Sequence, residues 1–240
     1  MRLRFLGTRG EIEARTRRHW RHSSLLIGYG RREVMIDCGL DWLDRLARLR
    51  PAAVVVTHAH PDHAAGLRDG APCPVYAPTE TWSAIQRYPI ADRRIVEPRR
   101  PLAVFGIEFE AFPVEHSLRA PAVGYRIMAG RAALFYAPDL VSIVEEKEAL
   151  WGLDLYVGDG AAVRRSIVRR RDGRTIGHAS IRAQLEWCAS AGLRRAVFTH
   201  CGSEIVKGDA RSIATSVRAL GSEHGIEARI AHDGLELTLG

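Results

Sequence analysis

Short runs of apolar residues, many of them β-branched, recur along the chain and alternate with segments of helical periodicity. Runs of about four to eight such residues predict strands, whereas longer periodic segments predict helices. We expect strands at residues 3–6, 24–28, 34–37, 52–57, near 75, from 107 towards 116, 123–127, 133–136, 153–157, 196–199 and 228–231. We expect helices at residues 41–49, from 78–79 onward, at 180–191 and at 210–220.

Strands and helices are mixed in both halves of the chain, and no repeat or low-complexity linker separates the halves. This arrangement predicts an α/β protein with one domain over residues 1–240, in which two sheets pack face to face with helices outside. A final hairpin is expected to turn at Asp233-Gly234, because Asp-Gly is a favoured two-residue turn.

The composition of the 240 residues is that of a soluble globular protein, with 46% apolar residues. No apolar stretch approaches the ~20 residues of a membrane span, and the start MRLRFLGTRG lacks the apolar centre of a signal peptide. These features predict a cytoplasmic protein without membrane contact. The four cysteines form no C-x-x-C pair, so we expect free thiols.

The net charge of +7 comes almost entirely from arginine, because Lys147 and Lys207 are the only lysines. Two segments are strongly basic, RTRRHWR at 15–21 and RRSIVRRRDGR at 164–174. Neither has the interleaved aromatic residues of a single-strand binder, so we interpret both as solvated loops. An anionic substrate that draws one or two arginines to a phosphate pocket remains an open alternative.

Residues 57–63 read THAHPDH and follow the apolar run AAVVV. An H-x-H-x-D-H match arises by chance in roughly one such chain in a thousand. Three crowded imidazoles would repel if protonated and would lack partners if buried and neutral, whereas a metal ion would satisfy them. His58 and His60 are two positions apart and can point to the same side, while Asp62 and His63 can address a second ion.

Further metal-type side chains follow other apolar strands. His116 ends the alternating strand, Asp139 follows LFYA, and His200 in AVFTHCG repeats the pattern of VVVTHAH. Each residue alone would more often be a capping or packing residue, and it is their joint occurrence that indicates a metal site.

The order H-x-H-x-D-H, His, Asp, His resembles the metallo-β-lactamase fold superfamily, and the similarity extends from IDCG at 36–39 to AHDG at 231–234. The resemblance implies an αββα four-layer sandwich with a dinuclear metal site at one edge. It implies that one divalent ion, zinc or manganese, binds His58, His60 and His116. A second ion would bind Asp62, His63 and His200, Asp139 would bridge the two, and Asp37 would support them from behind.

The segment GHASIRAQLEWC, which contains His178, resembles the phosphodiesterase branch of the superfamily, namely transfer-RNA 3′ processing nucleases and the phosphoribosyl cyclic phosphodiesterase. In that branch the extra histidine assists catalysis, although a histidine at a helix entry is the alternative. Asp159 in LYVGDG stands where the nucleases have a glutamate. Only 23 positions (139 − 116) separate His116 from Asp139, which leaves no room for the substrate arm of the nucleases.

The resemblance therefore implies a dinuclear hydrolase that cleaves a small, possibly cyclic, phosphodiester by attack of a metal-bridging hydroxide. Asp62 would orient the hydroxide, and His178 would donate a hydrogen bond or a proton. A thioester or lactone hydrolase is the main alternative, and a transfer-RNA nuclease without the arm is a further one. Nucleic acid is a less favoured partner than a small anion, and a homodimer is possible. The roles of His19, His22 and residues 164–174 are left unassigned.

Overall fold

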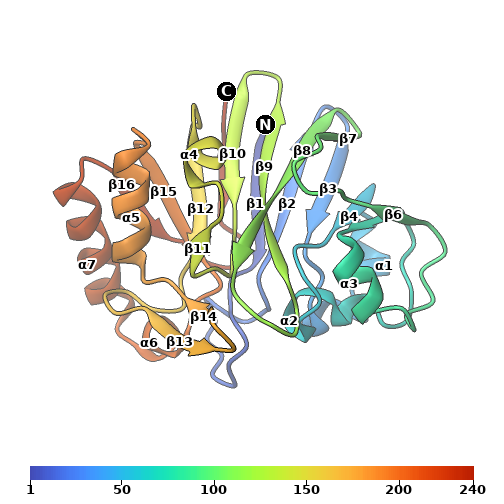
Figure 1. The fold of residues 1–240 in the computed structure, drawn as a ribbon, viewed down its shortest axis with the longest axis horizontal. Coiled ribbons are helices and arrows are strands. Elements are labelled where there is room, and N and C mark those ends of the chain that lie inside the picture. Colours follow the sequence, from blue (N-terminus) through green and yellow to red (C-terminus); the bar gives the residue numbers. More distant parts are fainter.

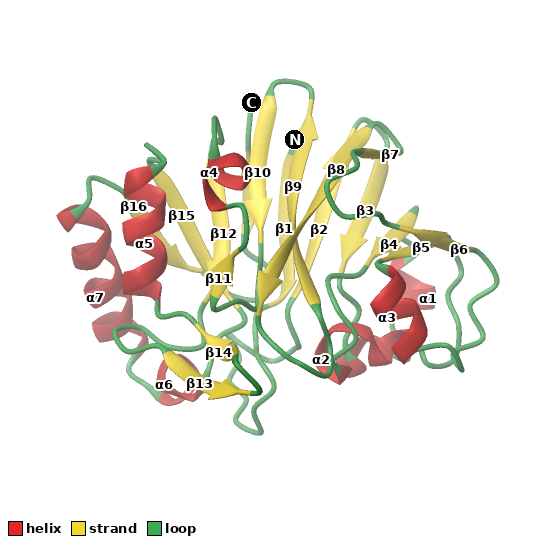
Figure 2. Cartoon of the chain, viewed as in Figure 1, coloured by secondary structure: helices red, strands yellow, loops and turns green.

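Two sheets pack face to face, and helices cover the outer face of each, as Figures 1 and 2 show for this computed structural model of residues 1–240. Both chain ends lie at one end of the sandwich in Figure 1, whereas short helices, loops and a small hairpin gather at the other end. The predicted αββα architecture is confirmed.

The amino-terminal sheet has seven strands in the order β17-β1-β2-β3-β4-β5-β6. They are β1 (Arg2–Gly7), β2 (Ser24–Tyr29), β3 (Arg32–Ile36), β4 (Ala53–Val55), β5 (Val75–Ala77), β6 (Arg93–Ile95) and β17 (Glu236–Thr238). Strands β3 to β6 run parallel. The carboxyl ends of β3 and β4 therefore meet at one edge, where the chain continues into Asp37 and into the motif at 58–63.

The second sheet has the order β11-β8-β9-β10-β12-β15-β16, with β7 paired to β8. Its strands are β7 (Leu102–Val104), β8 (Ile107–Glu115), β9 (Ala122–Ala129), β10 (Ala132–Tyr136), β11 (Ser142–Ile143), β12 (Leu155–Asp159), β15 (Arg195–Thr199) and β16 (Glu227–Ile230). β10, β12, β15 and β16 run parallel, so Asp139, Asp159 and His200 lie at or just past neighbouring strand ends.

Short helices connect the strands and pack outside the sheets. They are η1 (Leu40–Trp42), α1 (Leu46–Leu49), α2 (Pro61–Ala64), η2 (Ala65–Leu67), α3 (Thr79–Ala84), α4 (Glu146–Leu150), α5 (Ile181–Ser190), α6 (Ser203–Lys207) and α7 (Ala210–Glu223). Side-chain caps begin the two longest: Ser180 accepts from the Ala183 amide and Asp209 from the Ser212 amide. No helix of the protein has the length and apolar character needed to cross a membrane.

Three apolar clusters hold these layers together. The largest contains 26 buried residues and fills the space between the sheets, with Phe109 and Tyr125 in edge-to-face contact. Another lies between the second sheet and α4–α7, and the third lies between the first sheet and its helices around Trp42. Burial on both faces explains why the parallel strands are almost continuously apolar.

Most expected elements are present, but the helix expected at 41–49 is broken into η1 and α1. The amides of Leu43 and Arg45 bond the carbonyls three residues back, at 3.1 and 3.0 Å, which tightens the segment into 3₁₀ turns. The strand expected at 52–57 is shortened to β4, and the one expected at 153–157 is shifted to β12.

The hairpin expected at Asp233-Gly234 is wrong. β16 before this turn pairs with β15 in the second sheet, whereas β17 after it pairs with β1 in the first. The Asp233 carboxylate accepts hydrogen bonds from the Thr8 hydroxyl and from the amides of Trp20 and Arg21, at 2.8 to 3.1 Å. The turn is therefore tied to the loop after β1, and the chain crosses between the sheets.

Residues 164–174 are solvated as expected, because all of them are exposed, but the expectation of a loop is wrong. Five of its eleven residues form β13 (Ile167–Arg171), which pairs with β14 (Arg174–His178) in a separate two-stranded sheet. The Gly177 amide donates to the His116 carbonyl at 2.9 Å, so the base of this hairpin is attached beside a predicted metal ligand. Figure 1 places the hairpin at the end of the sandwich opposite the chain termini.

Candidate active site

All seven side chains predicted as metal ligands lie together at the edge of the sandwich. They form two groups that share Asp139, and in each group one potential ligand atom per residue lies within 4.8 Å of the others. The groups are His58, His60, His116 and Asp139, and Asp62, His63, Asp139 and His200. Each group can therefore hold one metal ion, with Asp139 placed to contact both.

In the first group the imidazole nitrogens converge. Nδ1 of His60 lies 3.0 Å from Nε2 of His58 and 3.2 Å from Nε2 of His116. The opposite nitrogens are held from behind: His58 Nδ1 lies 2.9 Å from the Thr57 hydroxyl, and His116 Nδ1 donates to the Gly177 carbonyl at 3.0 Å. Such outer hydrogen bonds fix the ring orientation of a metal-ligating histidine.

In the second group, histidines alternate with carboxylates. His63 Nε2 lies 2.9 Å from Asp139 and 3.2 Å from Asp62, while His200 Nε2 lies 2.9 Å from Asp62. Behind them, His63 Nδ1 donates to the Asp37 carboxylate at 2.8 Å.

Asp37 is fully buried and also accepts from the Thr57 amide at 2.8 Å and from its hydroxyl at 3.0 Å. Its backbone φ is +60°, a left-handed conformation that is uncommon outside glycine. His200 shares this feature with a φ of +54°, so two residues of the cluster hold strained backbone at strand ends.

Orphaned polar atoms test whether this cluster fits metal ions. His63 Nε2, Asp139 Oδ1 and His200 Nδ1 are buried and make no hydrogen bond of good geometry, although His200 Nδ1 and Asp139 Oδ1 are 2.8 Å apart. Buried polar atoms are costly when unpaired. Because these atoms lie close together, a bound metal ion would satisfy them. Imidazole nitrogens and carboxylate oxygens are suitable ligands for zinc and manganese, and the donor set therefore fits.

The histidine pKa values are lowered in the first ligand group and raised in the second. Burial, aided by neighbouring imidazoles, lowers the pKa of His58 well below its usual value and that of His60 to about 4, which leaves both neutral and ready to ligate. Burial also opposes charge on His63 and His200, but the nearby carboxylates outweigh it and raise the pKa of His63, and that of His200 to about 9. A metal ion binds in competition with these protons.

His178 and Asp159 form a pair next to Asp139. His178 Nδ1 donates to Asp159 Oδ2 at 2.8 Å and lies 3.3 Å from Asp139 Oδ1. Burial opposes its charge, yet the two carboxylates raise the pKa of His178 to about 11. Asp159 is fully buried and also accepts from the amides of Ala161 and Leu140. The imidazole is therefore anchored at Nδ1, and its ring borders the cavity.

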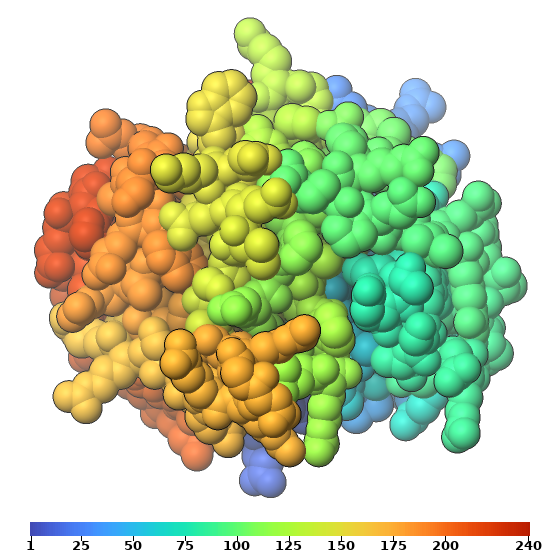
Figure 3. Space-filling view, in the orientation of Figure 1, coloured from blue at the N-terminus to red at the C-terminus, as the bar shows by residue number.

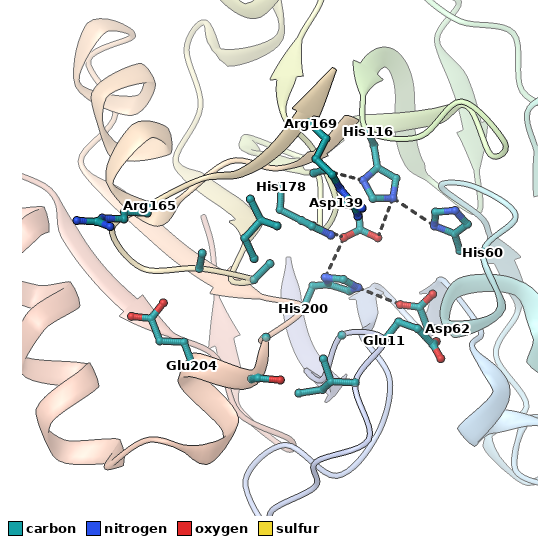
Figure 4. Close-up of a pocket in the computed structure, with 18 of the residues that line it drawn as sticks. Glu11, His60, Asp62, His116, Asp139, Arg165, Arg169, His178, His200 and Glu204 are labelled. Carbon is teal, nitrogen blue, oxygen red and sulfur yellow. Dashed lines mark hydrogen bonds and ion pairs between the residues drawn. The ribbon is translucent and has the colours of Figure 1, made fainter. Parts of the chain in front are cut away.

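A cavity of about 600 Å³ lies directly over these residues. Figure 4 shows His60, Asp62, His116, Asp139, His178 and His200 along its floor, with Arg165 on the side opposite His60. Four charged residues of the lining were not singled out from the sequence: Glu11, Arg165, Arg169 and Glu204. The basic run at 164–174 was the only signal for the two arginines, and nothing in the sequence marked the glutamates.

Close backbone packing keeps the motif at 58–63 in place. Pro61 begins α2, where its missing amide hydrogen costs nothing. A Cβ at Gly39 would lie 1.9 Å from the Asp62 carbonyl oxygen, so only glycine allows the loop after β3 to approach α2 this closely. The Cys38 amide donates to the His63 carbonyl at 2.7 Å across the same contact.

The loop after β1 is held by a buried arginine. Arg9 is 2% exposed and pairs with Asp41 at 2.6 Å, and the Asp41 carboxylate also accepts from the His22 amide at 2.9 Å. His22 and His19, which the sequence left unassigned, are both buried, and burial is the main reason that the pKa of each is lowered to about 4. Gly10, in the same loop, packs against the His200 ring.

Comparison with known proteins gives one consistent family. The model of the "Beta-lactamase superfamily domain" matches residues 32–201. Ribonuclease Z of Mycobacterium bovis (strain BCG / Pasteur 1173P2) is 24% identical over 221 residues, covering 74% of this chain and 78% of the relative.

Two solved structures share the fold over almost the full length of both chains. The metallo-beta-lactamase fold protein YhfI from Bacillus subtilis has a TM-score of 0.76 and 17% identity, covering 100% of this chain and 99% of its own. A structure described as a new diphosphatase from the PhnP family has a TM-score of 0.74 and 23% identity, covering 99% and 97%. With a matching domain model and the ligand set in place, this chain belongs to the β-lactamase superfamily of metal-dependent hydrolases.

Proposed function

We propose that this protein is a phosphodiesterase that uses two divalent metal ions to hydrolyse a small anionic diester. The observation that carries the proposal is the pair of His178 and Asp159, which sits beside the ligand cluster at the floor of a cavity that Arg165 and Arg169 also line. The relatives support it, because a ribonuclease and a diphosphatase both act at phosphorus–oxygen bonds.

The two ligand groups that share Asp139 would hold the ions, either zinc or manganese. When bound, such ions supply Lewis-acid activation of water and neutralise charge on the phosphoryl oxygens. Asp62 and Asp139 face the cavity as well as the ligand cluster. Asp62, held by His200 at 2.9 Å, is placed to accept a proton or hydrogen bond from an attacking water.

His178 would act on the leaving group. Because a carboxylate only accepts, the proton on Nδ1 is committed to Asp159, and Nε2 is the nitrogen left for the substrate. A hydrogen bond or proton from Nε2 to the leaving oxygen would offset the charge that develops as the phosphorus–oxygen bond breaks. A well-placed acid of this kind contributes about 10² to 10⁴ in rate.

Arg165 and Arg169 would attract the anionic substrate. Neither guanidinium is in an ion pair with a carboxylate, although each lines the cavity next to the ligand cluster. Unpaired arginine presents a planar set of donors that matches phosphate oxygens. Small substrates are favoured because β9 and β10 occupy the interval between His116 and Asp139, which leaves no inserted arm to grip a large nucleic acid.

The direct experiment is a comparison of three substrates with protein loaded with zinc or with manganese. We expect hydrolysis of bis-p-nitrophenyl phosphate and little turnover of an acyl thioester or a lactone, because only the phosphodiester uses the arginines and His178 together. Preferential turnover of the thioester or the lactone would contradict the proposal and indicate an acyl hydrolase on the same metal site.

A further inference from the structure

The β13–β14 hairpin carries a second cationic site beside the catalytic cavity. A cavity of about 400 Å³ lies next to the hairpin and is lined by Ser117, Leu118, Arg119, Arg169, Arg171, Asp172 and Ile176. Arg169 also lines the catalytic cavity, so one guanidinium joins the two spaces. Three arginines face a single carboxylate here, which leaves the small cavity positively charged.

The strand register places these arginines in line with the proposed catalytic histidine. Ile167 lies opposite His178, Arg169 opposite Ile176, and Arg171 opposite Arg174. Side chains two positions apart share a face of a strand and are separated by roughly 7 Å. The face that holds His178 therefore presents Arg169 roughly 7 Å and Arg171 roughly 14 Å along β13 from Ile167, the residue opposite His178.

These guanidiniums are not used by the fold. Arg119 and Arg169 are exposed and form no ion pair, and Arg171 has one loose contact, 3.9 Å from Asp172. Some other arginines do hold the fold together: Arg99, for example, contacts Glu110, Glu145 and Glu148. The hairpin stands on the surface in orange in Figure 3, so a ligand can reach it.

We propose that this second cavity binds another phosphate of the substrate. The preferred substrate is then a sugar phosphodiester that carries a further phosphate on another hydroxyl of the same sugar. Paired arginines bind phosphate by charge-assisted hydrogen bonds, and the Ser117 hydroxyl adds a donor. The spacing along β13 from Ile167, which lies opposite His178, to Arg169 is roughly 7 Å, about the separation of two phosphates on one sugar. The inference rests on the proposed function and names its substrate class.

A matched pair of substrates isolates the second phosphate. Thymidine 5′-(p-nitrophenyl phosphate) and its 3′-phosphorylated form have the same scissile bond and leaving group, and differ only in the added phosphate. We expect the 3′-phosphate to raise kcat/KM at least tenfold in the wild type. The double variant Arg119→Gln/Arg171→Gln should lose this advantage, mainly through KM.

Arg170→Gln is the control for Arg171→Gln alone, because each change removes one charge and Arg170 lies on the same strand but on the opposite face. It should keep the advantage. A wild type that prefers neither thymidine substrate, or an Arg170→Gln variant that loses as much of the advantage as Arg171→Gln alone, would overturn the inference and leave only a general attraction of anions.

Binding without turnover separates the two proposals. Calorimetry with thymidine 3′,5′-bisphosphate and thymidine 5′-monophosphate should show at least tenfold tighter binding of the bisphosphate, even if neither p-nitrophenyl substrate is cleaved. Equal affinities would refute the second phosphate site, whereas tight binding without any diester hydrolysis would refute the proposed function instead. If a dinucleotide is cleaved with the same kcat/KM as the 3′-phosphorylated substrate, the second cavity accepts the internal phosphate of a strand, which would overturn the preference for a small substrate.

Discussion

Replacing Asp159 by asparagine tests the pair of His178 and Asp159 with little change in shape. Asp159 Oδ1 accepts from the Ala161 amide at 2.7 Å, while Oδ2 accepts from His178 Nδ1 at 2.8 Å and from the Leu140 amide at 3.3 Å. An asparagine that keeps the Ala161 bond must turn its NH₂ group towards His178 and Leu140. This NH₂ donor then faces two other donors, the Nδ1–H of His178 and the N–H of Leu140. The imidazole must therefore give up its Nδ1 proton.

The size of the effect follows from this rearrangement. His178 would lose the carboxylate that contributes most to raising its pKa to about 11, and Nε2 could no longer act as an acid. We therefore expect kcat to fall by about 10² to 10⁴, the range assigned to a placed general acid, with a smaller change in KM. The buried amide facing the Leu140 N–H should cost about 1–3 kcal/mol of stability.

Steady-state hydrolysis of bis-p-nitrophenyl phosphate, metal content and Tm should be measured together on Asp159→Asn. Asp154→Asn is a suitable control, because the Asp154 carboxylate accepts a hydrogen bond from the Ala133 amide at 2.8 Å but contacts no histidine. The reasoning would be refuted if Asp159→Asn retained full kcat, or if it lost its metal ions along with its activity.

Three further results are expected. Asp139→Asn should reduce metal occupancy in both ligand groups at once, and unchanged metal content would remove Asp139 from the bridging role. Gly39→Ala should lower stability by about 2 kcal/mol or more and weaken metal binding, because the added methyl must displace the Asp62 backbone; an unaltered Tm would contradict this. His19 lies 2.9 Å from Thr8, and burial is the main cause that lowers its pKa to about 4. Below about pH 6.5 the unfolded chain therefore binds a proton at His19 that the folded protein does not bind. His19→Gln should therefore lose less stability between pH 7 and pH 5 in urea titrations, by up to about 1.4 kcal/mol per pH unit, and an identical loss in both proteins would count against it.

The ligand cluster was predictable because its residues follow apolar strands whose carboxyl ends meet at one edge. His58, His60, Asp62 and His63 lie within six residues. His116 and His200 come directly after strands with a clear pattern, and Asp139 comes three residues after β10. Asp37 and Asp159 were predicted from family resemblance, and the structure places them 2.8 Å from His63 and His178. Their roles as supports are a proposal that the experiments above test.

Two segments whose structure differs from the expected one contact partners far along the chain. The run at 164–174 has no apolar alternation that marks a strand, and its hairpin is instead attached through the Gly177 amide to His116, 61 positions away. Asp233-Gly234 has the signature of a hairpin, yet the Asp233 carboxylate bonds backbone amides more than 200 positions away. No local pattern encodes such contacts.

Hydrolysis of bis-p-nitrophenyl phosphate should be measured for the wild type and for His178→Ala, each with its metal content determined, to test whether the protein is a two-metal phosphodiesterase that uses His178. We predict two ions per chain in both proteins, clear turnover in the wild type, and a loss of kcat of about 10² or more in the variant. Loss of metal from His178→Ala, or a metal-loaded wild type that does not cleave the diester, would contradict this prediction.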